Sequence, residues 1–397
     1  MSSIRKNTVR LLVEVFAVAL KLGLTSFGGP IAHLGYFHEE YVRKRKWLDE
    51  RSYVDLVALC QFLPGPASSQ VGIGIGMMRG GILGGFAAFL GFTLPSVIAL
   101  IIFAFLLNGL NVNEAGWVHG LKIVAVVVVA QAIIGMARTL TPDLKRKALA
   151  LGALIVSLLI PATFTQVGII LISAIIGFLF FKHSDIQVDI AIPVPVPRTL
   201  ALVCLTFFFG LLLLLPILRD VTASHTIALF DSFYRSGALV FGGGHVVLPL
   251  LEKEFVPQGW ISKESFLAGY GAAQAVPGPL FTFAAYLGAV MNGWKGALLA
   301  TGAIFLPAFL LVMGTMPFWD ILRRNPKLKG AMLAVNGAVV GILIAAFYTP
   351  IWTSAIQSAK DFALGSILFS LLVILKLPPW VIVLAGMTGG TIFSLFY

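Results

Sequence analysis

Charged residues are scarce in this sequence. Only 11% of its 397 residues are Asp, Glu, Lys or Arg, against roughly a quarter in an average soluble domain. Hydrophobic residues make up 58%, and the mean hydropathy is +0.96. A chain of this composition has too few polar side chains to cover a water-exposed surface. We therefore expect an integral membrane protein.

Cysteine and catalytic motifs are equally scarce. The two cysteines, Cys60 and Cys204, lie in apolar runs and predict buried hydrophobic side chains, not a disulfide framework or metal cluster. The glycine-rich stretch 72–85 is followed by no Gly-Lys-Ser/Thr, which excludes a P-loop. No paired metal ligands and no Ser-His-Asp set occur in a plausible context. We expect no enzyme activity, no metal and no cofactor.

The formal net charge of +11 does not indicate a nucleic-acid-binding protein. Lys and Arg gather in short loops between apolar runs, where membrane orientation explains them better. Arg5, Lys6 and Arg10 precede the first apolar stretch, and no small-residue cleavage site follows them. We expect this stretch to be a retained segment, not a cleaved signal peptide.

Long apolar runs predict a polytopic, all-α membrane protein. Their length favours helices over the shorter strands of a membrane barrel. The expected full spans are 82–107, 117–137, 146–162, 165–182, 199–218, 293–316, 328–348, 361–377 and 380–396.

The two halves of the chain repeat one pattern. Gln-x-x-Pro-Gly-Pro occurs at 61–66 and 274–279, and Phe-Gly-Gly precedes it at 27–29 and 241–243, by 34 and 33 positions. A basic residue stands six positions before each phenylalanine, Lys21 and Arg235. Residues 1–182 and 222–397 are therefore interpreted as two copies of one transporter-like unit, with 183–221 as a linker.

Charge in the loops predicts that the two copies have opposite orientations. In the first copy Lys and Arg predominate in the loops 39–51 and 138–147, whereas in the second they predominate in 320–329. Cytoplasmic loops collect these residues, so the copies form inverted-topology repeats, with residues 45 and 325 on the cytoplasmic side. The unmatched apolar segment near 199–218 supplies the extra transmembrane helix that this inversion requires.

Glycine and proline interrupt the apolar runs at four places. Between Phe27 and the charged Glu39 about a dozen residues remain, roughly 18 Å as helix, which is too short to cross a bilayer. The Phe-Gly-Gly and Pro-Gly-Pro segments are thus predicted to be tips of re-entrant or broken-helix hairpins, two in each copy. Full but thin crossings would leave the loop orientation unchanged, so that alternative stays open.

Broken helices of this kind favour an anion as ligand. A half-helix that starts inside the membrane presents unpaired N–H groups and its positive dipole end to the break. Cations also outnumber acids among the charged residues inside apolar runs. The candidate substrate-binding residues are Lys21, Gly28, Gly29, His33, Gln61, Gly65, Pro66, Ser68, Ser69, Gln70, Arg79, Lys122, Arg235, Gly242, Gly243, His245, Gln274, Gly278, Pro279 and Thr282.

Several of these residues also have a purely structural interpretation. Lys21 and Arg235 are alternatively side chains that reach toward a headgroup layer, and Arg79 is alternatively a helix cap or interfacial anchor. His33 and His245 are proton carriers or satisfied structural donors. Asp55 and Asp231 are alternative proton carriers or partners of a nearby base. Gln61 and Gln274 bind the ligand or cap carbonyls freed by the helix breaks.

The motifs resemble those of the chromate ion transporter family over nearly the whole chain. The likeness lies in "FGGP…H", "EEYVRKRKWLDE", "QFLPGPASSQ" and "MMRGG" in the first copy and "FGGGH…QAVPGP" in the second. Matching positions are Gly28, Gly29, Pro30, His33, Gln61, Pro64, Gly65, Pro66, Ser68 and Arg79. The second copy departs at Gly244, at Val247 and over 280–283, which favours backbone donors over side chains there.

The resemblance implies export of chromate from the cytoplasm by a secondary transporter, with sulfate as a competing or related substrate. We expect a multi-pass protein of a prokaryotic cytoplasmic (inner) membrane that works by alternating access at the repeat interface. A sulfate or other oxyanion carrier and an anion channel are the alternatives. A proton is a candidate coupling ion, and a homodimer is the commonest oligomer on symmetry grounds.

Overall fold

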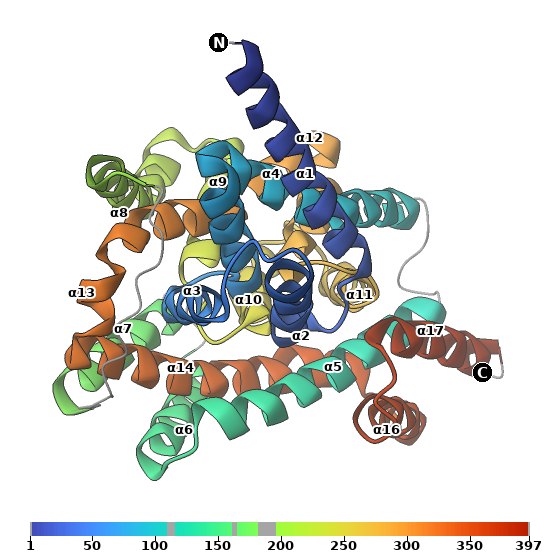
Figure 1. Ribbon diagram of the computed structural model, residues 1–397. Helices are drawn as coiled ribbons and strands as arrows, with labels where there is room; N and C mark the ends of the chain where they lie inside the picture. Colours follow the sequence, from blue (N-terminus) through green and yellow to red (C-terminus); the bar gives the residue numbers. More distant parts are fainter. Residues whose placement is uncertain (1, 109–115, 161–164, 182–195, 396–397) are drawn as a thin grey trace.

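The computed structural model describes residues 2–108, 116–160, 165–181 and 196–395, and these contain helices and no strand (Figure 1). The elements are α1 (Ser2–Thr25), α2 (Gly29–Phe37), η1 (His38–Lys44), α3 (Glu50–Phe62), α4 (Ala67–Asn108), α5 (Gly116–Leu140), α6 (Leu144–Leu159), α7 (Thr165–Phe180), α8 (Arg198–Thr222), α9 (His225–Ala238), η2 (Gly244–Val246), α10 (Val247–Phe255), α11 (Lys263–Ala273), η3 (Leu280–Thr282), α12 (Phe283–Thr315), η4 (Met316–Phe318), α13 (Trp319–Arg323), α14 (Pro326–Ala346), η5 (Phe347–Trp352), α15 (Thr353–Ala355), α16 (Ala359–Val373) and α17 (Pro379–Leu395).

The expected all-α membrane architecture is confirmed. Five helical segments among the described residues are long and apolar enough to cross a bilayer: 67–107, 116–140, 198–222, 280–322 and 326–355. Each of the nine spans expected from the sequence coincides with a helix or part of one, within a few residues. The expected ends at 162, 182 and 396 lie outside the described residues. The protein is a multi-pass membrane protein.

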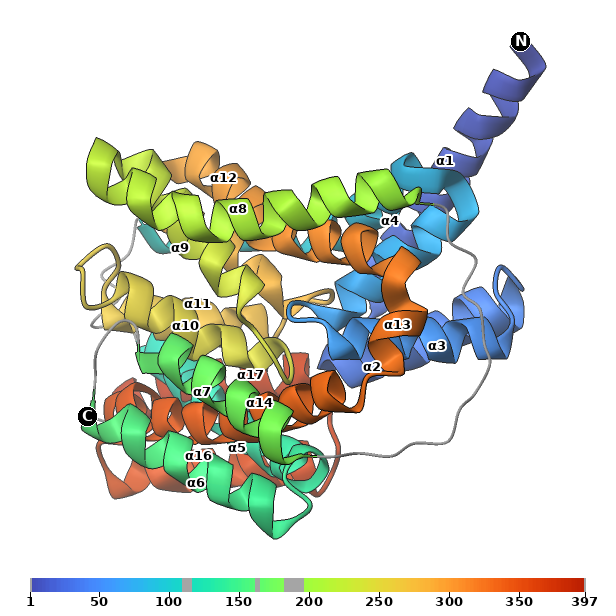
Figure 2. The same ribbon diagram turned by 90° about the vertical axis from the view of Figure 1, so that its left-hand side faces the viewer.

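The helices lie in three layers (Figure 2). One outer layer contains α4, α8, α9 and α12, and the other contains α5, α6, α7, α14, α16 and α17. The short helices α2, α3, α10 and α11 lie between them. Because these short helices flank the Gly and Pro motifs, the layering places the motifs inside the molecule.

All four predicted helix breaks are present. α1 ends at Thr25 and α2 starts at Gly29, while α3 ends at Phe62 and α4 starts at Ala67. In the second copy the helix is interrupted between α9 and α10 and between α11 and α12, with a single 3₁₀ turn in each interval. Gly28, Gly65, Gly242 and Gly278 have φ between 79° and 113°, which side chains disfavour.

In the first copy, the α1–α2 and α3–α4 hairpins each begin and end on the same side of the molecule. Arg79, at the far end of the α3–α4 hairpin, lies over the Trp47 ring at 5.2 Å, just before α3 begins. Arg79 and Arg45 each approach Glu14 of α1, with nitrogen–oxygen distances of 3.5 and 3.6 Å. The starts and ends of both hairpins are thus gathered at one end of the molecule.

A second break within α4 and α12 is matched in the two copies. Gly80 and Gly81 interrupt α4 with dihedrals of (−134°, 22°) and (64°, −162°). Asn292 and Gly293 interrupt α12 with (−149°, 35°) and (57°, −153°). The helix folds back on itself at each, so that two glycines touch across the fold, at 76 and 84 in α4 and at 288 and 296 in α12. The long second part of each helix then forms an expected span.

Helices of the two copies interlock. α14 of the second copy packs against α6 and α7 of the first, whereas α5 of the first copy packs against α16 and α17 of the second. Glycines allow these close approaches, since a Cβ on Gly177 would meet the Gly330 carbonyl and one on Gly120 would meet the Gly386 carbonyl. Each copy is therefore completed by helices of the other.

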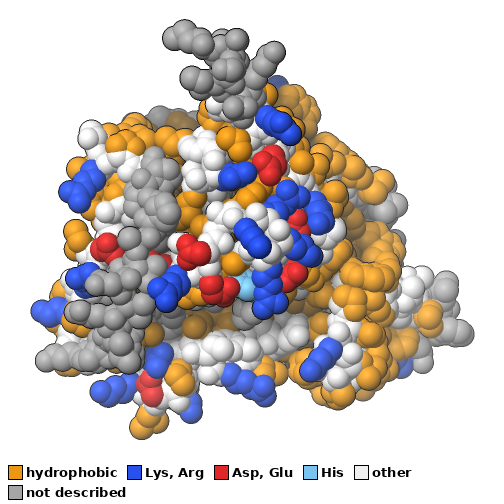
Figure 3. All heavy atoms as spheres, viewed as in Figure 1, with side chains coloured by type: hydrophobic (Ala, Val, Ile, Leu, Met, Phe, Trp, Pro, Cys, Tyr) orange, Lys and Arg blue, Asp and Glu red, His pale blue; other side chains and the backbone are white. Residues whose placement is uncertain are grey.

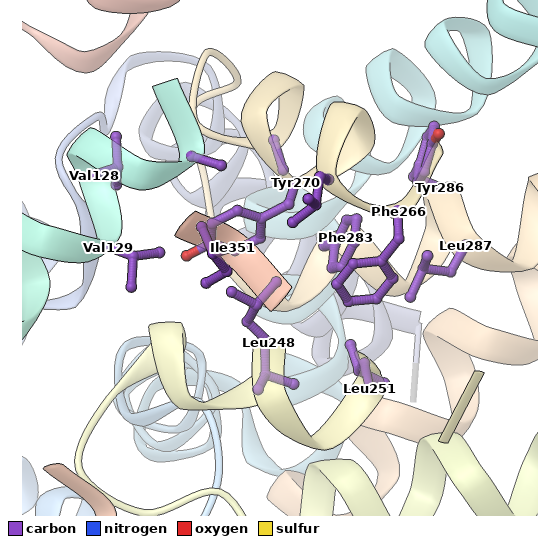
Figure 4. Close-up of a cluster of buried hydrophobic side chains, with 14 of the residues drawn as sticks. Val128, Val129, Leu248, Leu251, Phe266, Tyr270, Phe283, Tyr286, Leu287 and Ile351 are labelled. Carbon is purple, nitrogen blue, oxygen red and sulfur yellow. The ribbon is translucent and has the colours of Figure 1, made fainter. Parts of the chain in front are cut away.

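The core joins the short hairpin helices to this interlocked layer. Figure 4 shows Leu248 of α10, Tyr270 of α11 and Phe283 of α12 together with Val129 of α5 and Ile351 of η5. All five side chains are almost completely buried. The helix breaks are thus held by a packed apolar core.

Candidate functional site

The four breaks meet through two reciprocal backbone hydrogen bonds. Gly65 N, in the Pro-Gly-Pro tip of the first copy, donates to Val240 O, just before Phe-Gly-Gly of the second copy, at 2.7 Å. Gly278 N, in the second Pro-Gly-Pro tip, donates to Ser26 O, just before Phe-Gly-Gly of the first, at 2.9 Å. Such an exchange is what a pseudo-twofold relation between the copies requires.

Polar side chains of the first copy converge at this junction. Nδ1 of His33, on α2, lies 3.3 Å from Oγ of Ser68, on the first turn of α4. The backbone of Ser26 lies close to the same imidazole. All three residues are at most 3% exposed. The edge of the His33 ring packs on Phe92 of α4, which fixes its orientation.

Several buried polar atoms of the junction lack a hydrogen-bond partner within the described chain. They include Ser26 Oγ, His33 Nε2, Ser69 Oγ, Gln70 Oε1 and Thr93 Oγ1. A buried unsatisfied group costs about 1–3 kcal/mol, so folded proteins keep few of them. Their concentration near the helix breaks indicates a place for a polar ligand or ordered water.

The Pro-Gly-Pro tips are stabilised locally. Gln70 Nε2 donates to the Pro64 carbonyl at 2.7 Å, and Gln70 N donates to the Pro66 carbonyl at 2.9 Å. The amides of 67–69 precede this first helical bond and point into the break. In the second copy Thr282 donates through its hydroxyl to the Pro279 carbonyl at 2.7 Å, so that hydroxyl is already engaged.

The second copy presents a different set of side chains. His245 Nδ1 lies 2.7 Å from the Tyr270 hydroxyl, and Gln274 lies beside Tyr270. A Cβ on Gly242 would meet Met136, Leu140 and Val339, whereas one on Gly243 would meet nothing within 4 Å. His33 thus has hydrogen-bonding neighbours in Ser68 and the Ser26 backbone, and His245 has one in Tyr270.

Lys21 and Arg235 occupy matched ion pairs, although Nε of Arg235 is buried without a hydrogen-bond partner. Lys21 Nζ lies 3.0 Å from Glu40 Oε2, and Arg235 Nη1 lies 2.9 Å from Glu254 Oε1. Each pair joins the two arms of a Phe-Gly-Gly hairpin, and both pairs span 19 residues. We name them the hairpin clasps. Both cations therefore have a carboxylate partner.

The first clasp belongs to a wider network at the hairpin ends. Arg45 Nε donates to Glu40 Oε1 at 2.9 Å. Burial raises the pKa of Glu40, but hydrogen bonds from Arg45 and Lys21 outweigh it and hold that pKa below its ordinary value. Arg79 joins this network through Glu14 and Trp47 and lies at the far end of its half-helix from the tip.

The second clasp is buried and has more members. Arg235 Nη2 lies 2.6 Å from Asp231 Oδ2. Arg219 of the linker helix α8 lies 3.5 Å from Asp231 and 3.6 Å from Glu254. Two guanidinium groups thus face two carboxylates, so the cluster is electrically balanced.

Other candidates lie outside the junction. Gln61 is exposed at the end of α3. Lys122 is 9% exposed on α5, beside α11 and within electrostatic range of Glu264 and Lys263. Asp55, considered as a proton carrier, accepts a hydrogen bond from Trp319 Nε1 at 2.8 Å. The structure therefore brings together His33, Ser68 and the tips, but not these three residues.

Sequence reasoning did not single out Ser26, Thr93, Tyr270, Glu40 or Glu254. Ser26 directly precedes Phe-Gly-Gly, and the acids follow their basic partners by the same interval in both copies. That equal spacing was the available signal for the clasps. Thr93 and Tyr270 lie in apolar runs without a motif.

One end of the molecule is rich in basic side chains. Figure 3 shows Lys and Arg gathered on the face viewed in Figure 1, where the first-copy hairpins begin and end. In the first-copy loop that ends η1, Arg43, Lys44 and Arg45 pair with Glu39 or Glu40. The Trp319–Asp55 hydrogen bond brings the start of α13, in the second copy, beside α3 near the same end.

Comparison with known proteins gives relatives of similar length. A probable chromate transport protein of Synechococcus elongatus is 29% identical over 391 residues, which cover 94% of each chain. An uncharacterized transporter of Methanocaldococcus jannaschii is 26% identical over 84% of this chain and 83% of its own. A chromate transport protein of Pseudomonas aeruginosa is 25% identical over 83% of this chain and 79% of its own. No solved structure matches.

The family model described as "Chromate transporter" matches residues 13–178 and again 227–391, one match in each copy. The matched segments contain all four helix breaks and both hairpin clasps. This protein belongs to the chromate transporter family.

Proposed function

We propose that this protein is a secondary transporter that exports a tetrahedral oxyanion from the cytoplasm, with chromate as the leading candidate substrate. The observation that carries the proposal is the concentration of buried, unpartnered polar atoms where four helix breaks meet. The names of the Synechococcus and Pseudomonas relatives support chromate as the substrate. Membership of a transporter family supports transport over enzymatic activity.

Substrate recognition rests on the ends of the half-helices. The first-turn amides of α4 and the hydroxyls of Ser68 and Ser69 offer several donors within one turn. A tetrahedral dianion accepts hydrogen bonds at four oxygens, and a helix N-terminus adds its positive dipole end. The site would therefore replace much of the anion's hydration shell at the midplane.

Alternating access follows from the pseudo-twofold arrangement. The Gly65–Val240 and Gly278–Ser26 bonds tie each tip to the other copy, so a rocking motion of one copy changes both contacts together. The contact between α3 and α13 supports placing residues 45 and 325 on one membrane face, as inverted repeats require. We take that face as cytoplasmic because it carries the basic loops.

We also propose the membrane in which the protein lies, its coupling ion and its oligomeric state. The relatives are bacterial and archaeal, which supports a prokaryotic cytoplasmic (inner) membrane. A proton is the candidate coupling ion, with His33 and His245 nearest to the junction. A homodimer is proposed from symmetry statistics alone.

A sulfate or other oxyanion carrier is the second candidate, because sulfate and chromate make nearly the same hydrogen-bonding demand. An anion channel is the third. Channel flux is not accelerated by substrate on the opposite side of the membrane, whereas carrier exchange is.

The test is a counterflow assay in proteoliposomes of the full chain. Chromate, sulfate, molybdate and phosphate are compared as internal and external anions at several pH values. We expect saturable chromate uptake that internal chromate accelerates. Chromate flux no greater than in protein-free liposomes would overturn the proposal, and flux without saturation or counterflow would identify a channel.

A further inference from the structure

Three of the four positive residues that the sequence predicted to bind the anion have carboxylate partners. Lys21 and Arg235 form the hairpin clasps, and Arg79 pairs with Glu14. The unpartnered donors at the junction belong instead to hydroxyl and imidazole groups. We propose that the oxyanion binds on the first-copy side of the junction, through Ser26, His33, Ser68 and Ser69; this inference rests on the proposed function.

Ser26 is a binding residue in this proposal. Its carbonyl accepts the Gly278 amide, which fixes the backbone, and its side chain is fully buried with no partner for Oγ. The hydroxyl is therefore held at the contact between the copies without an internal use. Ser96 lines the other side of the same tip, since a Cβ on Gly278 would lie 3.0 Å from Ser96 Oγ.

His33, Ser68 and Ser69 continue this surface. His33 uses Nδ1 toward Ser68, which leaves Nε2 buried and unpartnered. Ser69 Oγ is likewise buried and unpartnered, one residue further along the first turn of α4. Hydroxyl, imidazole and main-chain donors thus come together from α1, α2 and α4 of one copy.

The second copy lacks these side chains at the corresponding positions. Val240, Val247 and Phe281 stand in place of Ser26, His33 and Ser68, and all three are buried. Thr282 stands in place of Ser69, but its hydroxyl is bonded to Pro279 O. The second copy therefore contributes the backbone of its tip, and the site is asymmetric although the fold is pseudosymmetric.

The test compares side chains at Ser26 and Ser69 in proteoliposomes, with chromate as the probe. We expect Ser26→Ala and Ser69→Ala each to raise the KM for chromate about tenfold or more, as loss of a hydrogen bond to a charged group does. Ser69→Thr keeps a hydroxyl at this position and should leave KM within about threefold of wild type. Thr315→Val removes a buried hydroxyl bonded within its own helix and is the matched control.

The outcomes separate this inference from the proposed function. Wild-type protein that carries no tested oxyanion overturns the proposed function. Wild-type transport combined with an unchanged KM in both alanine variants overturns the first-copy site. Detergent melting temperatures distinguish a binding defect from misfolding, because only a binding defect raises KM while the melting temperature stays near that of Thr315→Val.

Discussion

Arg235 shows how a buried charge depends on its neighbours. It contacts Asp231 and Glu254, and all three side chains are at most 10% exposed. Removing one partner from a buried ion pair costs about 3–5 kcal/mol, whereas removing both charges together costs much less.

We expect Arg235→Met to lower the melting temperature of the purified protein markedly. Adding Asp231→Asn restores the balance of charge with Arg219 and should recover at least about half of that loss. The measurement is thermal unfolding in detergent for the two single variants and the double variant. Equal and additive losses would show that the charges do not act as one cluster.

The sequence predicted which residues lie near the breaks better than it predicted their roles. Gly65, Ser68 and His33 were recognisable because their motifs recur with fixed spacing. Lys21 and Arg235 are predicted to contact substrate or to reach toward a headgroup layer, and the structure adds a carboxylate 19 residues away that each of them faces. That pairing depends on how the hairpin closes, which local sequence does not determine.

At the scale of elements, the Pro-Gly-Pro tips depend on backbone geometry. Gly278 has φ of 103°, and a Cβ there would lie 3.0 Å from Ser96 Oγ and 3.4 Å from Phe92 O. A residue held in such a region costs about 1–3 kcal/mol. The tip also carries the amide that bonds Ser26.

Gly278→Ala should therefore lower both the melting temperature and the rate of chromate uptake. Gly302→Ala is the matched control, because this α12 glycine has nothing within 4 Å of its added Cβ. Thermal unfolding and initial uptake rates are measured on both variants. A Gly278→Ala protein that behaves like Gly302→Ala would contradict the role of the tip.

Helix breaks were predictable because Gly and Pro act locally, through a positive φ and a missing donor. The interruption at Gly80–Gly81 agrees with the predicted helix end at Arg79 and the predicted span from residue 82, but the close packing of the two arms around it was not predicted. It depends on close contact between Gly76 and Gly84, four residues to either side of the turn.

At the scale of the whole molecule, the two copies exchange helices. α5 is packed by α16 and α17, and α14 by α6 and α7. The repeat and its loop charges were visible in the sequence, but this exchange was not, because it depends on contacts between segments more than 150 residues apart, such as Gly177 with Gly330 and Gly120 with Gly386.

Labelling of cysteines from each side of sealed vesicles shows directly whether the two copies have opposite orientations around a shared site. Lys44→Cys, Lys327→Cys and Pro257→Cys place thiols at exposed positions, and the native Cys60 and Cys204 are buried. We expect an impermeant reagent to label positions 44 and 327 from the cytoplasmic side and position 257 from the opposite side. Labelling of 44 and 327 from different sides would contradict these opposite orientations.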